Sequence, residues 1–205
     1  MTQTKLRTEG LEHTDNISFP IGTAIAVKKY SQKLDFEGIL SRFKKRGIDL
    51  HRLIEALVTY RLTENGSICR GSDWINRPHV LQEFNLNGFE ERTLFRSLKI
   101  VGENYEEIIT LLQKSIFSQY DFPHTDVNLD WTSFVLWGNK AELGKYGYSR
   151  GHRPDKKQIT VGISQLRAPM NIPVGLTVQS GNINDQRHFK TTFEQVASIL
   201  RDGSK

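Results

Sequence analysis

The sequence is poor in cysteine, with Cys69 alone among 205 residues. A single cysteine excludes an intrachain disulfide and a metal site built from cysteines. Long apolar runs are missing too, because no stretch approaches the roughly 20 apolar residues that a membrane-spanning helix needs. The first ten residues, MTQTKLRTEG, also lack the apolar segment of a signal peptide. These absences lead us to expect a cytoplasmic protein that makes no contact with membranes.

Several catalytic motifs are missing as well. No glycine-rich segment ends in Gly-Lys-Ser or Gly-Lys-Thr, as the loops that cradle nucleotide phosphates do. Five of the six histidines are scattered without metal-ligand spacing, so we expect ordinary surface or core residues at His13, His51, His79, His124 and His188. Ser149 and His152 lie close together, but no strand-turn-helix pattern surrounds them, which argues against a serine hydrolase.

Positive charge is in modest excess and is unevenly placed. The net charge is +5, with a pI near 9.3. Up to residue 122, lysines and arginines number 17 against 16 acids, whereas from residue 123 onward they number 11 against 7. Most of that excess falls within residues 140–157, so this stretch is where a polyanion would bind.

The spacing of apolar residues predicts a helical first region. Residues 1–18 are polar and aperiodic, and we expect a flexible tail there. Over residues 19–122 apolar side chains recur at helical spacing. Asp49 is a plausible N-cap, and Gly47 and Pro78 mark helix ends. This region would bind DNA or mediate oligomerisation.

After residue 122 the period changes from helical to alternating. Strands are predicted around residues 127–137, 158–165 and 173–179, the last two forming a hairpin. Asn184 or Asp185 would cap a final helix, which would pack on the sheet through Phe189, Phe193 and Val196. The predicted fold class is α+β. One helix on three strands leaves a sheet face and an edge uncovered, so the second region is expected to be incomplete.

Asp130 is the first candidate site residue. An aspartate in the middle of a strand is unfavourable by propensity, and it is costly if it is buried without a partner. A divalent cation such as Mg²⁺ would compensate it, because hard cations prefer carboxylate oxygens. The structural alternative is that Asp130 faces water on an edge strand.

The basic stretch is the second candidate. Residues 140–157 contain six lysines and arginines, interleaved with two tyrosines and a histidine. Cations neutralise phosphates and aromatic rings stack on bases, so the stretch suits a nucleic-acid track. A solvated loop would have a similar composition. The third candidate is Gly181, Asn182 and Asp185, which we interpret as a structural turn and helix cap.

In this order, the three pieces resemble the catalytic domain of Asp-Asp-Glu transposases of bacterial and archaeal insertion sequences. The family's first catalytic aspartate lies in an Asp-x-Thr-Ser/Thr setting, matched by residues 130–133 (DWTS). A Gly-Tyr-Ser-Lys/Arg-x-x-Arg-Pro-Asp stretch is matched by residues 147–155. Later strand motifs are matched by residues 158–162 (QITVG), 172–175 (IPVG) and 181–185 (GNIND). The resemblance covers about residues 125–200.

The resemblance implies a ribonuclease H-like domain, of which residues 123–205 would be the first half. It implies transposition of an insertion sequence by metal-dependent cleavage and transfer of DNA strands, in a nucleoid-associated protein. Asp130 would be a catalytic residue and a ligand of Mg²⁺ or Mn²⁺. The phosphate contacts would be Lys145, Arg150, Arg153, Lys156 and Lys157.

Members of the family continue with a fourth strand bearing a second aspartate, and later with a helix bearing the glutamate. Neither segment occurs in this sequence, so we expect a truncated transposase that is inactive alone and binds metal weakly or not at all. Two-metal cleavage needs ions about 3.5–4 Å apart, held in this family by carboxylates from three segments. The alternative is a non-catalytic DNA-binding or dimerising regulator of transposition, whose partners would be DNA, itself or a full-length transposase. A generic nuclease of the same fold is a third option.

Overall fold

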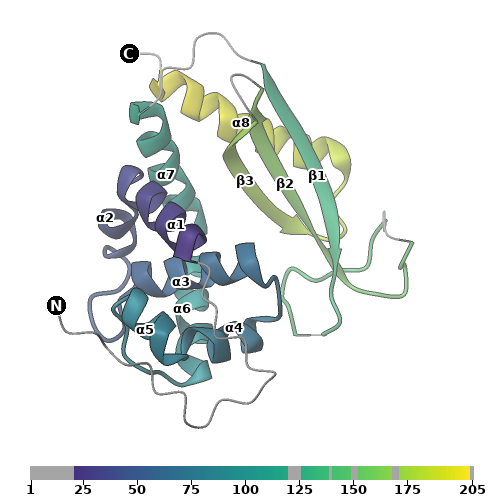
Figure 1. Cartoon of the computed structure of the whole chain (residues 1–205). Helices are drawn as coiled ribbons and strands as arrows, with labels where there is room; N and C mark the ends of the chain where they lie inside the picture. The colour runs from purple at the N-terminus through teal and green to yellow at the C-terminus, as the bar shows by residue number, and fades with distance from the viewer. Residues whose placement is uncertain (1–20, 120–125, 139, 149–151, 168–170, 204–205) are drawn as a thin grey trace, which may run out of the picture.

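The chain folds into a helical half followed by a sheet half (Figure 1). The computed structural model describes residues 21–119, 126–138, 140–148, 152–167 and 171–203, with the backbone alone at 185 and 199–203. The elements in chain order are α1 (Ile21–Lys33), α2 (Phe36–Leu40), α3 (Leu50–Thr63), α4 (Ile68–Ile75), α5 (Pro78–Glu83), α6 (Glu91–Glu103), α7 (Tyr105–Gln119), β1 (Val127–Val135), β2 (Gln158–Leu166), β3 (Ile172–Ser180) and α8 (Asp185–Gly203). The α+β prediction is confirmed. None of the described helices could cross a membrane.

The helix boundaries follow the local signals in the sequence. Asp49 occupies the N-cap position of α3, although its side chain makes no capping hydrogen bond. Pro78 is the first residue of α5, where its missing N–H is not needed. Gly47 lies at the end of the turn that follows α2. Its φ of 81° is in the left-handed region, which favours glycine. α2 ends at Leu40, and the Phe43 N–H bonds the carbonyl of Leu40 in a tightened turn after it.

Two apolar clusters hold the helical half together. The larger one surrounds α3 and α4, where the rings of Tyr60 and Trp74 lie 5.6 Å apart. The smaller one joins α2, α3 and α7 through Ile39, Leu50 and Ile108. Because α7 contributes to this second cluster, the last helix before the sheet is packed into the helical half.

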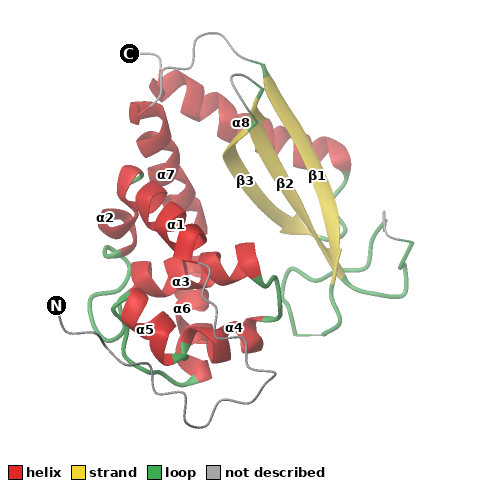
Figure 2. Cartoon of the chain, in the orientation of Figure 1, coloured by secondary structure: helices red, strands yellow, loops and turns green. Residues whose placement is uncertain are grey.

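The three strands form an antiparallel meander in the order β1-β2-β3 (Figure 2 shows the sheet beside the helices). Asp130 lies opposite Ile163 in the β1–β2 register. The β2–β3 pairing contains an irregularity between Ser164 and Gln165. Within the described residues, β1 is paired on one side only, so it forms an edge of the sheet.

α8 packs on one face of the sheet through polar side chains. His188 and Thr192 are fully buried, and Thr177 Oγ1 lies 2.9 Å from His188 Nε2 and 3.2 Å from Thr192 Oγ1. The predicted packing of this helix is therefore only partly right. Val196 is buried, but Phe189 and Phe193 are exposed and stack on each other at 6.0 Å.

The reason is the composition of the sheet face that α8 covers. Buried positions of β2 and β3 on this side carry polar groups, including Thr160, Ser164 and Thr177. α8 supplies hydrogen-bonding groups to Thr177, whereas a phenylalanine stripe would leave the Thr177 hydroxyl unpaired. A Cβ at Gly162 would lie 2.7 Å from His188 Nε2, so a glycine allows this close approach.

α7 lies against β3 on the opposite side of the sheet. The Gln113 side chain is buried and donates a hydrogen bond to the carbonyl of Val174. An apolar cavity of about 290 Å³ lies between the two elements, lined in part by Ile163 and Leu176. The face predicted to be uncovered is therefore partly covered by a helix from the first half.

Candidate nucleic-acid interface

Asp130 lies in the middle of the edge strand β1. Side chains alternate along a strand, and Trp131 packs toward α8 with its ring 5.6 Å from that of His188. Asp130 therefore points to the opposite side, where it shares a face with Ile163 and is exposed. Its Oδ1 accepts a hydrogen bond of 2.8 Å from the Trp131 N–H. The structure thus matches the edge-strand interpretation and leaves the carboxylate accessible.

The loop between β1 and β2 is anchored at the end of the sheet (Figure 1). Lys145 and Gln158 exchange two backbone hydrogen bonds of 3.1 and 2.9 Å. The Gln158 side chain is fully buried and donates from Nε2 to the carbonyls of Tyr148 (2.6 Å) and Gly181 (3.2 Å). Gln158 therefore ties the basic loop to the turn that follows β3, and we did not anticipate this role from the sequence.

Two glycines allow that contact. A Cβ at Gly147 would lie 2.1 Å from the carbonyl oxygen of Gly181, and a Cβ at Gly181 would lie 1.9 Å from the carbonyl oxygen of Gln158. No side chain fits at such distances from backbone atoms. The structure thus brings together the basic loop and the Gly-Asn turn, which were separate candidates in the sequence.

Gly181 and Asn182 form a turn after β3. Ser180 Oγ lies 2.5 Å from Asn182 Oδ1, and the Ile183 N–H bonds the carbonyl of Ser180. The side chain that caps α8 is that of Asn184, which accepts a 2.9 Å hydrogen bond from the Arg187 N–H. Asp185 is the first helical residue instead, and its side chain lies outside the described residues.

The cations of the loop differ in their surroundings. Arg153 makes a bidentate ion pair with Asp155, with both N–O distances at 2.8 Å. The hydrogen bond from Arg153, together with its charge, lowers the pKa of Asp155 to about 2. Lys145 is exposed, and Lys156 and Lys157 are half-buried. Arg150 lies outside the described residues.

Trp137 is the residue of this region that sequence analysis missed. It follows β1 and is 78% exposed. The guanidinium carbon of Arg153 and Nζ of Lys156 each lie 5.2 Å from its ring centroid. The sequence signal that could have identified Trp137 as part of the interface was its position just after a strand and shortly before a basic loop.

Asp130 lies at the centre of β1, whereas the loop cations lie beyond the end of that strand. Val135 lies five positions along β1 from Asp130 and pairs with Gln158 at the base of the loop. At about 3.3–3.4 Å per strand residue, the separation is roughly 17 Å. Among the described residues no three His, Cys, Asp or Glu side chains form a group suited to a metal ion. Asp130 is thus a single accessible carboxylate, with a cationic loop at the end of its strand.

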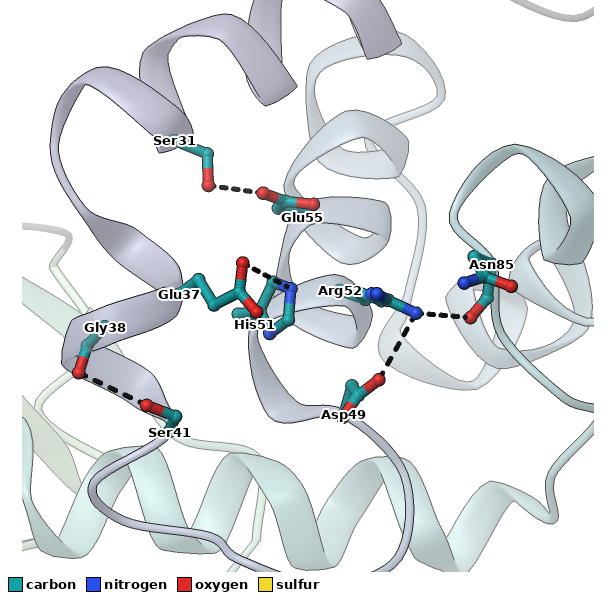
Figure 3. A network of polar contacts seen from close by, with 9 residues as sticks. All are labelled: Ser31, Glu37, Gly38, Ser41, Asp49, His51, Arg52, Glu55 and Asn85. Carbon is teal, nitrogen blue, oxygen red and sulfur yellow. Dashed lines mark hydrogen bonds and ion pairs between the residues drawn. The ribbon is translucent and has the colours of Figure 1, made fainter.

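The helical half contains a second polar region, around a cavity of about 390 Å³ lined by residues of α1, α2, α3 and α5. Figure 3 shows contacts around it. They include Ser31 Oγ to Glu55 Oε1, His51 Nε2 to Glu37 Oε2 (3.9 Å), and Arg52 to Asp49 Oδ2 (3.4 Å) and to the carbonyl of Asn85 (3.2 Å).

Each cation at this cavity faces an acid. Besides Arg52, Lys28 also forms an ion pair there, with Nζ 2.6 Å from Glu83 Oε1. Acids outnumber lysines and arginines in the cavity lining, so no excess cation is offered to a phosphate. Residues 44–46 (KKR) form a basic cluster after α2, where Lys44 donates a hydrogen bond to the carbonyl of Ile48 and burial lowers its pKa. The β1–β2 loop is the better candidate for phosphate binding.

Comparison with protein-family models, curated proteins and solved structures returned no significant match to this chain.

Proposed function

We propose that this chain is a DNA-binding part of an Asp-Asp-Glu transposase, contributing the first carboxylate of a ribonuclease H-like catalytic domain. One observation carries the proposal: β1 bears an accessible aspartate at its centre and leads directly into an anchored loop of cations and exposed aromatic rings. The motif resemblance of residues 130–185 supports the family. The antiparallel meander covered by α8 is consistent with the opening half of such a domain.

The spacing along β1 suits a duplex. Base pairs rise about 3.4 Å along the helix axis, so the separation of roughly 17 Å between Asp130 and the loop spans about five base pairs. A duplex that presents one phosphate at Asp130 would present others to Lys145, Lys156 and Lys157. The lysines would supply affinity through phosphate neutralisation, and such contacts are independent of base sequence.

The metal assignment extends to Asp130 alone. Its exposed carboxylate is a suitable ligand for Mg²⁺ or Mn²⁺, and a bound ion would stabilise negative charge on a scissile phosphate. Two-metal cleavage requires several carboxylates around ions about 3.5–4 Å apart, and the described residues hold no such group. We therefore assign Asp130 as one ligand of a centre completed by other groups, and derive no cleavage step from it.

The same observation supports a second candidate from another class. A chain that binds DNA through the loop without a complete metal centre would occupy element ends and block a full-length transposase. This regulator would need the lysines but not Asp130. Both candidate functions include DNA binding. They differ in whether the function of the chain requires Asp130.

Duplex binding tests the shared step. We expect the affinity for a 30-base-pair duplex to fall with salt at a slope of about −2.7 on logarithmic axes, if three lysines each neutralise one phosphate at about 0.9 per contact. The double variant Lys156→Ala/Lys157→Ala should flatten the slope by up to about 1.8. Fluorescence anisotropy between 50 and 300 mM salt measures both values.

A charge-matched control separates local contacts from net charge. Lys99→Ala/Lys114→Ala also removes two positive charges, from exposed positions on α6 and α7. We expect this variant to keep the wild-type slope. Equal flattening by both doubles would show that the loop has no special role, and absence of duplex binding at 50 mM salt would refute the proposal.

A further inference from the structure

Trp137 is held in place but left open to solvent. The neighbouring Leu136 N–H donates a 2.8 Å hydrogen bond to the carbonyl of Lys157, which continues the β1–β2 pairing past the strand. Trp137 therefore leaves the sheet at a defined position. An indole that is 78% exposed keeps a large apolar surface in water, and tryptophan is usually well buried in folded proteins.

Two cations flank the ring without covering it. Arg153 and Lys156 lie at 5.2 Å from the ring centroid, within the range of cation–π contacts. The exposed fraction shows that most of the indole surface is still accessible. The ion pair with Asp155 fixes the guanidinium of Arg153, so the surroundings of the ring are arranged before any ligand arrives.

Two further rings are exposed in the same loop. Tyr146 and Tyr148 are 58% and 86% exposed. They flank Gly147, whose Cβ position is occupied by the backbone of Gly181. Because the glycine faces the turn, the tyrosines on either side of it are directed toward solvent. The loop thus offers flat apolar surfaces beside cations, which is the combination that binds nucleotides with unpaired bases.

We infer that Trp137 is a stacking platform for an unpaired nucleobase, with Lys156 contacting the adjoining phosphate. The inference rests on the proposed DNA binding and specifies the ligand further. Bases in an intact duplex are stacked on each other and present no free face, so the ligand is a single strand or an opened duplex end. An acidic protein segment would satisfy the cations but would leave the exposed rings without partners.

Binding of the full chain to a fluorescein-labelled 12-nucleotide oligothymidylate tests the inference. Trp137→Ala should weaken this binding by about 5- to 140-fold, the loss expected for one stacked base. Trp137→Phe keeps a ring and should recover most of the affinity. Affinity for the 30-base-pair duplex should change less than about twofold in either variant, since duplex contacts are made to phosphates. Tyr30→Ala, which removes an exposed ring on α1, should have no effect.

A second ligand provides an independent test on the unmodified protein. A 12-nucleotide strand of abasic sites keeps the phosphates and removes the bases. Wild-type protein should prefer oligothymidylate over this strand, and Trp137→Ala should lose that preference. Circular dichroism confirms that each variant is folded, and the wild-type comparison holds even if one is not.

The outcomes separate this inference from the proposed function. Equal binding of oligothymidylate by wild type and Trp137→Ala, or equal binding of both strands by wild type, would overturn the stacking role. Parallel losses for oligothymidylate and duplex would also overturn it, because they would show that Trp137 only supports the loop. Duplex binding that persists in either case would leave the proposed function standing, whereas failure of the duplex itself refutes that function.

Discussion

Replacing Arg153 with alanine removes a cation and also uncovers an acid. Both guanidinium contacts to Asp155 are 2.8 Å long, so in the native loop the two charges cancel at short range. The pair contributes little net charge toward a phosphate. Loss of Arg153 alone would leave the Asp155 carboxylate facing the DNA, and the loop would change from neutral to negative at this position.

The expected magnitude follows from counting phosphate contacts. Asp155→Ala releases Arg153 and should steepen the slope of log affinity against log salt by up to about 0.9, whereas Arg153→Ala should flatten it by up to about the same amount. The double variant Arg153→Ala/Asp155→Ala should keep the wild-type slope. A change of 0.9 corresponds to about 3.5-fold in affinity between 200 and 50 mM salt.

Duplex anisotropy titrations at pH 7 measure these slopes. The pKa of Asp155 is depressed to about 2. The contribution of the ion pair to folding stability is therefore fully present above about pH 4 and is lost as the pH falls through 2. Asp155 is therefore ionised throughout the assay. The single and double Arg153 variants both lack the contact with Trp137, so their difference reports Asp155 alone. Equal slopes for these two variants would refute the charge-cancellation argument.

Two further predictions concern the turn and the metal. Gly181→Ala should lower the free energy of unfolding by about 1–3 kcal/mol or more, because its Cβ would meet the carbonyl oxygen of Gln158 at 1.9 Å. Gly102→Ala, on α6 with open space around it, should instead raise it by up to about 1 kcal/mol, and urea denaturation compares the two. Incubation of the chain with supercoiled DNA and Mn²⁺ should give no nicking dependent on Asp130, since no metal-binding group of three residues occurs among the described residues. Robust cleavage that is lost in Asp130→Ala would contradict the proposal that Asp130 needs other groups to complete the metal centre.

Local patterns in the sequence predicted most elements of the fold. The change from helical to alternating spacing near residue 122 lies between α7 and β1, and the hairpin of β2 and β3 follows from its short connection. These features depend on residues close together in the chain, where steric and hydrogen-bonding preferences act directly. Asn184, one of the two caps considered, is the residue whose side chain bonds the helix.

The orientation of α8 could not be predicted in the same way. Phe189 and Phe193 form the apolar stripe that usually faces a core. The sheet face beneath α8 is polar, however, and Thr177 pairs with both His188 and Thr192. Which stripe is buried depends on side chains of other elements, and their register is not visible in the helix sequence alone.

The candidate site was predicted in its parts but not in its assembly. Asp130 and the basic loop were identified by residue type. The contact between the loop and the Gly181 turn depends on the Gln158 side chain, which sequence analysis treated only as the start of a strand. The pairing of Arg153 with Asp155 likewise depends on a loop conformation that the sequence does not specify.

α7 has a consequence for how the chain can be divided. It buries Ile108 in the helical half, and it covers β3 through Gln113 and the apolar cavity shared with Leu176. A fragment starting at residue 123 would lose this cover and expose the apolar side of β3 to water, and it would also carry an unpaired strand edge at β1. Such a fragment would be prone to aggregate, whereas one starting at residue 105 would keep the helix on the sheet. The two halves should consequently melt in one cooperative transition, since α7 cannot leave one core without disturbing the other.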